Sequence, residues 1–115
     1  MELDFVSLTV KDMDRAVGFY SDLLGEEPER KDSRLSFYDL GNIRLSLWNA
    51  SADDMDVDFG DNCVATFRTE DIEQERERVK QLASEVEEIK DAGGYRLFHF
   101  RDTEGNLVEV YEGEK

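Results

Sequence analysis

Two side chains in the second half of this sequence have the chemistry of proton donors and acceptors, His99 and Glu109. Imidazole and carboxylate groups often transfer protons or hold polar ligands in enzymes. Each also has a passive interpretation: His99 as a residue of a cleft or sheet edge, and Glu109 as the ion-pair partner of Arg44 or Arg68. The two residues are therefore candidates for catalysis or ligand binding, with both alternatives open.

Cationic and aromatic side chains form a second candidate group. Arg44 and Arg68 could each bind a carboxylate or a phosphate through two N–H groups. Phe5 and Trp48 could stack on a planar ligand, or they could fill a cleft or a dimer contact instead. These residue types indicate recognition of a small organic molecule and specify no reaction.

Nucleophilic catalysis has little support in this sequence. Cys63 is the only cysteine and His99 the only histidine, and nothing around Cys63 predicts an activated thiolate. We therefore interpret Cys63 as structural. A single cysteine forms no intrachain disulfide, which fits a reducing compartment.

The elements that must position these residues occur twice. The segments FVSLTVKD (5–12) and VATFRTED (64–71) lie 59 residues apart, and each alternates like a strand before an acidic residue and a helical stretch. Likewise, GNIRLSLW from Gly41 corresponds to GNLVEVYE from Gly105. The sequence therefore predicts two copies of one strand–helix–strands unit.

Helix signals are clearest in the first copy. Asp12 is placed to cap a helix whose apolar stripe runs from Met13 to Leu24 and whose end falls at Gly25. In the second copy, Asp71 and Gln74 form a capping-box-like start. The remaining predicted elements are short edge strands at Pro28 and at Val86–Ile89, and hairpins over 34–40/43–49 and 95–102/106–112.

This order predicts an α+β fold of two βαβββ modules that form a concave mixed β-sheet with the helices on its outer face. We expect a single domain over 1–115, with module one at 1–50, an acidic linker at 51–61 and module two at 62–115. Strand alternation predicts which side chains line the cleft of the concave sheet. They are Phe5, Ser7, Arg44, Ser46, Trp48, Val64, Thr66, Arg68, His99, Glu109 and Tyr111.

Composition excludes two classes of partner. The chain has 115 residues, 29 acidic against 14 basic, and a formal net charge of −15. Such a charge opposes binding to nucleic acid or to an anionic membrane, and we expect neither. No apolar run approaches the length of a membrane span, and the first residues do not resemble a secretion signal, so we expect a cytoplasmic protein. A halophilic source is a further hypothesis.

Three segments carry a resemblance to a known family. VSLTVKDMDRAVGFYSDLLG (6–25), FRTEDIE (67–73) and FRDTEGNLVEVYE (100–112) are similar to patterns of the vicinal oxygen chelate superfamily. That superfamily contains glyoxalase I, bleomycin- and fosfomycin-resistance proteins and extradiol dioxygenases. The resemblance covers nearly the whole chain, and it implies a cleft for a small organic molecule and a homodimer.

The resemblance also implies where a metal ion would bind. Metal-dependent members coordinate a divalent cation through one inward residue on each of four strands. The matching positions are Phe5, Ser46 (or Arg44 in a shifted register), Val64 and Glu109, and only Glu109 has a side chain of the family's ligand type. Because a divalent cation needs about three or four protein donors, we expect no metal and no other cofactor.

The main hypothesis is a glyoxalase/bleomycin-resistance/dioxygenase-like protein that binds a small organic molecule in the cleft without the family metal. Two alternatives remain. One is a metal-dependent lyase or isomerase with atypical ligands such as His99 and Glu109. The other is a non-catalytic dimeric interaction module.

Overall fold

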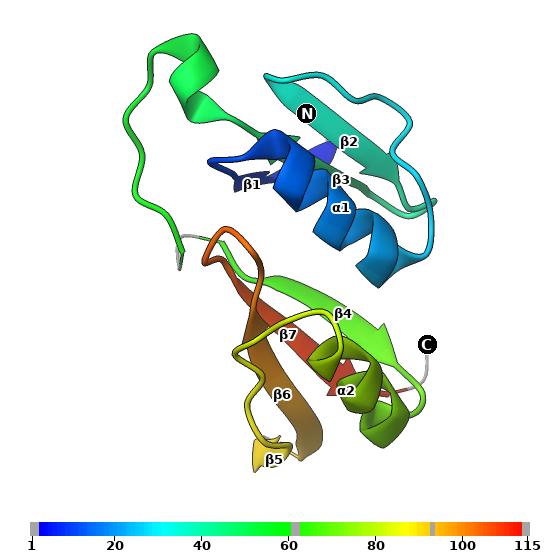
Figure 1. Ribbon diagram of the computed structural model, residues 1–115. Helices are drawn as coiled ribbons and strands as arrows, with labels where there is room; N and C mark the ends of the chain where they lie inside the picture. Colours follow the sequence, from blue (N-terminus) through cyan, green and yellow to red (C-terminus); the bar gives the residue numbers. More distant parts are fainter. Residues whose placement is uncertain (1–2, 61–62, 93, 114–115) are drawn as a thin grey trace. The chain divides into compact units, whose positions relative to one another are not determined.

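The computed structural model describes residues 3–60, 63–92 and 94–113 (Figure 1). It divides into two compact units, the first ending at Phe59 and the second beginning at Gly60. The predicted modules begin or end at residues that the structure does not describe, namely 1–2, 62 and 114–115. Residue 61, the last of the predicted linker, also lies outside the described residues. The division into modules at 1–50 and 62–115 stays a prediction.

The first unit is a three-stranded mixed sheet with one α-helix. β3 is central, parallel to β1 and antiparallel to β2. Leu8, Leu45 and Leu47 are buried, whereas Phe5 and Arg44 are exposed, so one sheet face carries the core. The elements are β1 (Phe5–Thr9), α1 (Met13–Leu24), β2 (Leu35–Asp39), β3 (Arg44–Trp48) and the 3-10 helix η1 (Ala50–Asp53).

Helix α1 begins and ends where the sequence predicts. Asp12 accepts a hydrogen bond from the backbone N–H of Arg15 at 3.1 Å, and Gly25 ends the helix in the left-handed conformation at φ 70°. The apolar stripe of α1 is buried at Met13, Ala16, Val17, Phe19, Tyr20 and Leu23. Tyr38 joins β2 to this helix, because its hydroxyl lies 2.9 Å from Oγ of Ser21.

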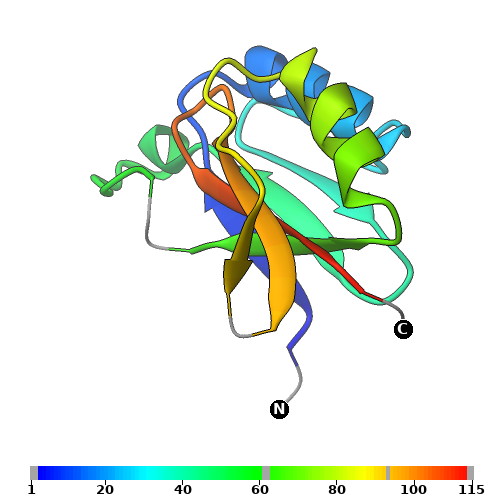
Figure 2. The same ribbon diagram turned by 90° about the horizontal axis from the view of Figure 1, so that it is seen from below.

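The second unit has a four-stranded mixed sheet in the order β4-β7-β6-β5. β7 is parallel to β4 and antiparallel to β6, and α2 contacts β6 and β7 on one face of the sheet (Figure 2). The core between them contains Ile72, Val79, Phe98, Phe100, Val108 and Val110. The elements are β4 (Ala65–Thr69), α2 (Ile72–Lys80), β5 (Lys90–Ala92), β6 (Tyr95–Arg101) and β7 (Leu107–Glu112).

The two units share one chain path: a strand, a helix, and a hairpin whose last strand pairs in parallel with the first. Asp71 accepts from the N–H of Gln74 at 3.2 Å, as Asp12 does for Arg15 in α1. The predicted α+β class with two repeated units is therefore confirmed. A single concave sheet built from both units stays a prediction.

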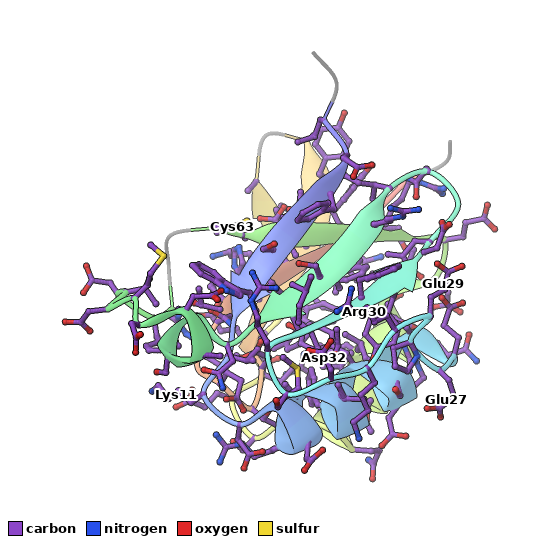
Figure 3. The ribbon with its side chains drawn as sticks, turned by 90° about the horizontal axis from the view of Figure 1, so that it is seen from above. Lys11, Glu27, Glu29, Arg30, Asp32 and Cys63 are labelled. Atoms are coloured by element: carbon purple, nitrogen blue, oxygen red, sulfur yellow. The ribbon has the colours of Figure 1, made fainter. Side chains whose placement is uncertain are left out.

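The prediction of an edge strand at Pro28 is wrong. The described chain there makes one isolated bridge, between Arg30 and Phe37, and it continues into a loop. Nε of Arg30 donates to Asp32, which lies beside it, at 3.0 Å (Figure 3). The Asp32 carboxylate also accepts from the backbone N–H of Leu35 at 2.7 Å. These bonds within the loop replace the ladder that a longer edge strand would form.

The edge strand predicted at Val86–Ile89 lies later in the chain, at Lys90–Ala92. Val86 forms an isolated bridge with Phe100, whereas the strand itself, β5, begins only at Lys90, which pairs with Leu97. Between these pairs, three residues of the edge segment lie opposite two residues of β6. This is a β-bulge, which the alternation of apolar residues cannot reveal.

The first residues of the predicted linker at 51–61 belong to the 3-10 helix η1. Asp53 lies at the end of η1 and accepts from Nε of Arg34 at 2.8 and 2.9 Å and from Nε1 of Trp48 at 2.9 Å. These bonds fasten η1 to the β2–β3 hairpin. Among the described residues, neither α-helix is long or apolar enough to cross a membrane.

Candidate functional site

The candidate residues of the second unit lie on the sheet face opposite α2, which we call the open face of that unit. On β7, Glu109 is flanked by Thr66 of β4 and by His99 of β6 in one row across the sheet. One step along β7, Tyr111 is flanked by Arg68 and Leu97 in the same way. Because alternate residues of a strand face opposite sides, these two rows share the open face, whereas Phe98 and Phe100 face the core.

His99 and Glu109 form a hydrogen-bonded pair on this face. Nε2 of His99 lies 2.9 Å from Oε2 of Glu109, and the two side chains are 19% and 26% exposed. No ion pair between Glu109 and Arg68 is found in the part of the second unit that the structure describes, and the pairing with Arg44 of the first unit stays a prediction. The contact follows from the β6–β7 register, which sets the two residues directly opposite.

A third side chain reaches His99 from the bulged edge segment. Oε2 of Glu87 lies 3.4 Å from Nδ1 of His99, and the backbone N–H of Glu87 donates to the His99 carbonyl at 2.9 Å. His99 therefore has a carboxylate at each ring nitrogen. Glu87 was not among the residues predicted from the sequence, because the bulge that brings it beside β6 leaves no mark in the residue pattern.

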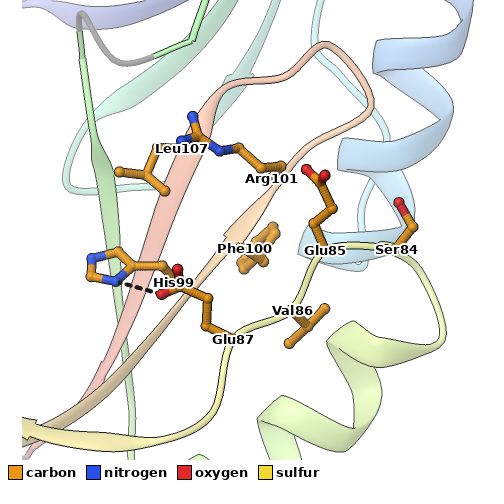
Figure 4. A pocket seen from close by; sticks show the side chains of 8 residues that line it. All are labelled: Ser84, Glu85, Val86, Glu87, His99, Phe100, Arg101 and Leu107. Atoms are coloured by element: carbon orange, nitrogen blue, oxygen red, sulfur yellow. Dashed lines mark ion pairs between the residues drawn. The ribbon is translucent and has the colours of Figure 1, made fainter.

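A pocket of about 430 Å³ opens beside His99, entirely within the second unit (Figure 4). Its walls are the edge segment on one side and β6 with the start of β7 on the other. Val86, Phe100 and Leu107 supply apolar surface, whereas Glu85, Glu87 and Arg101 supply charge. The lining residues are Ser84, Glu85, Val86, Glu87, His99, Phe100, Arg101 and Leu107. Of these, only His99 was a sequence candidate.

The open face of the first unit carries hydroxyl and aromatic groups. Ser7 and Ser46 lie directly opposite on β1 and β3, and their Oγ atoms are 2.6 Å apart. Beside them on β2, the ring of Phe37 lies 5.2 Å from the guanidinium carbon of Arg44. This face resembles a platform for an apolar or planar group, but it carries no counterpart of the His99–Glu109 pair.

The expected lining residues thus fall into two groups. Thr66, Arg68, His99, Glu109 and Tyr111 share the open face of the second unit. The first unit's group is Phe5, Ser7, Arg44, Ser46 and Trp48, which lie on β1 and β3. Val64 precedes β4 and is 42% exposed. One cleft lined by both groups stays a prediction.

The strand registers identify the residue equivalent to Glu109. Ser7 and Thr66 are equivalent by the 59-residue repeat; Ser7 lies opposite Ser46, and Thr66 lies opposite Glu109. By this register, the residue of the first unit that is equivalent to Glu109 is Ser46. The Ser46 hydroxyl is already hydrogen-bonded to Ser7. An arginine at that position would have repelled a cation, whereas this serine gives at most one weak donor.

The donors present do not fit a metal ion. His99 meets Glu87 and Glu109 at opposite ring nitrogens, so the three side chains do not converge on one point. Within the described ranges, no three or more His, Cys, Asp or Glu side chains are grouped to hold a metal. The described side chains therefore do not offer the three or four converging donors that a divalent cation needs.

Two further groups of ion pairs lie outside the Thr66–Glu109–His99 row. Arg96 lies between Glu73 and Glu112, and its hydrogen bond to Glu73 lowers the pKa of that carboxyl group. In the first unit, hydrogen bonds from Arg34 and then from Trp48 lower the pKa of Asp53. The Arg96 ion pairs and the Asp53 hydrogen bonds therefore stabilise local structure, and we assign them no role in ligand binding.

Comparison with solved structures finds the same architecture in other proteins. Lactoylglutathione lyase from Agrobacterium tumefaciens is 26% identical, with a TM-score of 0.81 over 97% of this chain and 93% of its own. Another A. tumefaciens protein, solved by solution NMR, is 21% identical, with a TM-score of 0.85 over 100% and 99%. A bleomycin-binding protein complexed with bleomycin is 15% identical, with a TM-score of 0.74 over 99% and 100%.

Sequence comparison gives one further result. The model of the Glyoxalase/Bleomycin resistance protein/Dioxygenase superfamily matches residues 2–110. No curated protein matches the sequence significantly.

Proposed function

The chain belongs to the Glyoxalase/Bleomycin resistance protein/Dioxygenase superfamily, and from this premise we propose that it binds a small organic molecule on its open sheet faces without the family's metal ion. The observation that supports this most directly is the Thr66–Glu109–His99 row on the second unit. These polar side chains lie on a sheet face beside a pocket, where binding sites commonly hold a few polar groups among apolar ones.

The ligand contacts follow from the chemistry of each side chain. Glu109 accepts hydrogen bonds, Thr66 both donates and accepts, and Arg68 supplies a positive charge. Tyr111 adds an aromatic surface, and its ring lies 5.8 Å from that of Tyr95. In the first unit, Phe5 and Trp48 would pack on an apolar part of the ligand, and Ser7 and Ser46 would meet its polar part. The proposed ligand therefore combines a hydrogen-bond donor with a planar or apolar body.

Two findings support binding over a purely structural role. The similar protein complexed with bleomycin demonstrates that this fold can hold an organic molecule, although at 15% identity it does not indicate the ligand here. Moreover, Glu109 is a half-buried carboxylate on a sheet face that α2 does not cover. A purely structural sheet face would gain more from an apolar residue at that position.

A thermal-shift screen of a small-molecule library tests the proposal. A ligand that binds the folded chain raises its melting temperature by an amount set by RT ln(1 + [L]/Kd). Arg68→Ala and Glu109→Gln should weaken each hit. Arg78→Ala and Glu88→Gln make the same changes on α2 and on an exposed segment and should not. Hits that respond equally to both pairs of variants, or an absence of hits, would contradict the proposal.

A metal-dependent lyase or isomerase is the second candidate function. Two observations favour it: the His99–Glu109 pair, which has the composition of an acid–base couple, and the 26% identity to lactoylglutathione lyase. Protein purified without chelator would be analysed for metal and assayed with lactoylglutathione, with Ni²⁺, Zn²⁺, Mn²⁺ or Fe²⁺ added back. Stoichiometric metal with metal-dependent turnover would establish this function in place of metal-free binding.

We also propose that the chain forms a homodimer in the cytoplasm. The family resemblance supports a dimer, and closed two-fold assemblies are the commonest among soluble oligomers. Sedimentation equilibrium at micromolar concentration should give twice the chain mass of 13.3 kDa. A monomer under these conditions would contradict the dimer. A dimer that binds no library member would instead favour the non-catalytic interaction module.

A further inference from the structure

The pocket of the second unit has one wall that carries two glutamates. Its volume of about 430 Å³ falls in the range of small-molecule sites. Two backbone hydrogen bonds hold the edge segment, residues 84–89, to β6: the N–H of Glu87 donates to the His99 carbonyl at 2.9 Å, and the N–H of Arg101 donates to the Glu85 carbonyl at 3.1 Å. The backbone of both glutamates is therefore fixed along this wall of the pocket.

Strand alternation places Glu85 and Glu87 on the same side of the edge segment. Val86 lies between them and pairs with Phe100, whose side chain is buried in the core. The two glutamates therefore lie on the open face. Figure 4 shows both side chains leaving the edge segment toward the pocket that they line. Residues two positions apart on a strand are about 7 Å apart, so one small molecule can reach both.

These two carboxylates differ from the neighbouring glutamate in their partners. In the described ranges, no hydrogen bond or ion pair of the Glu85 side chain is found, and the Glu87 carboxylate has its 3.4 Å contact with the His99 ring. The next residue, Glu88, forms an ion pair with Arg76 at 3.4 Å. The pocket therefore holds carboxylate oxygens that can still accept from a ligand.

The arginines of the open face form no ion pair with these glutamates among the described residues. Nη1 of Arg101 donates to the Gly105 carbonyl at 3.2 Å, which directs its guanidinium group to the β6–β7 turn. Arg68 lies opposite Tyr111, farther along the sheet. The net charge of −15 adds a long-range attraction for cations. The wall of the pocket therefore favours a positively charged group.

We propose that this pocket binds the charged end of a small organic cation that carries N–H donors, such as an ammonium, amidinium or guanidinium group. Glu85 and Glu87 accept hydrogen bonds from these donors, and such bonds between charged groups are stronger than neutral ones. Leu107 and Val86 contact the apolar part of the molecule. This inference rests on the proposed binding function and names the class of ligand that the open face receives.

Four probes with the same phenyl ring test this ligand class: benzamidinium, benzamide, benzoate and phenyltrimethylammonium. Each would be titrated into isotope-labelled protein at neutral pH, and amide chemical shifts would report where it binds. Benzamidinium should give saturable shifts in the edge segment and in β6. Benzamide lacks the charge, benzoate has the opposite charge and phenyltrimethylammonium lacks N–H groups, so each should bind several-fold more weakly.

Variants of the two glutamates assign the binding to the pocket. Glu85→Gln and Glu87→Gln should each weaken benzamidinium binding about threefold, and the double variant about tenfold, as expected for partly exposed charge pairs. Glu88→Gln is the matched control, because it removes the same charge from an adjacent, 91% exposed side chain and should leave the Kd unchanged. Amide spectra of the free variants would verify that each is folded.

Three results would overturn the inference. The first is the absence of saturable shifts at the pocket with millimolar benzamidinium. The second is equally tight binding of benzamide or of phenyltrimethylammonium. The third is an equal loss of affinity in Glu88→Gln, which would indicate a general attraction of cations to an acidic protein.

The outcome is separable from that of the proposed function. If library hits depend on Arg68 and Glu109 and benzamidinium does not bind, the binding function stands and the cation site fails. If benzamidinium binding depends on Glu85 and Glu87 and no library hit depends on Arg68 or Glu109, the cation site stands and the proposed function fails.

Discussion

Trp48 donates a hydrogen bond from its indole nitrogen to Asp53 at 2.9 Å, and this bond joins β3 to the 3-10 helix that follows it. Asp53 also accepts two bonds from Nε of Arg34. One exposed carboxylate thus organises the exit of the chain from the first unit. Trp48 is the only tryptophan, so tryptophan fluorescence reports on the surroundings of this one indole, which include the contact with Asp53.

Acid should break the Trp48–Asp53 hydrogen bond at a pH lower than that at which an aspartate ordinarily titrates. The hydrogen bonds from Arg34 and Trp48 lower the pKa of Asp53 below its ordinary value of 3.8. A lowered pKa means that the stabilisation is complete above 3.8 and is lost as the pH falls through the folded-state value. Trp48 fluorescence should therefore change with a midpoint below 3.8.

Asp53→Asn provides the control for this titration, because an amide does not ionise in that range. The variant should lose the fluorescence transition while the rest of the fold titrates as before. A midpoint above 3.8 in the wild type, or the same transition in Asp53→Asn, would rule out Asp53 as its source.

Replacement by alanine should change the unfolding free energy in opposite directions at two glycines of the first unit. Gly18 is an exposed residue in the middle of α1 with no atom within 4 Å of an added Cβ, so Gly18→Ala should stabilise the chain by about 0.5–1 kcal/mol. Gly25 has equal space but a φ of 70°, so Gly25→Ala should destabilise by about 1 kcal/mol. Urea unfolding of both variants checks the difference, and equal effects would contradict it.

Removal of the Tyr38 hydroxyl should destabilise the first unit. The hydroxyl is buried, lies 2.9 Å from Ser21 and donates to the Val17 carbonyl at 3.2 Å. Burial is also the largest cause that raises the pKa of Tyr38, so the phenol stays neutral as a donor. Tyr38→Phe should cost about 1–2 kcal/mol of unfolding free energy. Tyr95→Phe, at a 57% exposed tyrosine, should cost much less.

Salt should stabilise the chain as a whole. A net charge of −15 on 115 residues makes the folded state repel itself, and added salt screens this repulsion. The melting temperature should rise between 0.1 and 1 M KCl, where the screening length falls from about 10 to 3 Å. A continued rise at higher salt would support the halophile hypothesis, whereas no rise in molar KCl would contradict it.

Local sequence signals were enough for most of the fold. The caps at Asp12 and Asp71, the glycine after α1 and the hairpin turns each depend on residues a few positions apart, so the sequence displays them. In the β6–β7 turn, Asp102 accepts from the backbone N–H groups of Glu104 and Asn106 at 2.8 Å. Such bonds join residues only two to four positions apart, so they do not require contacts with distant parts of the chain.

The polar contacts of the site required the tertiary structure. The sequence determined that His99 and Glu109 share a sheet face, since strand alternation decides it, but it offered Arg44 and Arg68 as partners for Glu109. The β6–β7 register selected His99 instead. The position of Glu87 beside His99 could not be predicted from the sequence, because a bulge sets its position beside β6. Alternation is a property of one strand, whereas register and bulges belong to pairs of strands and form only when distant segments meet.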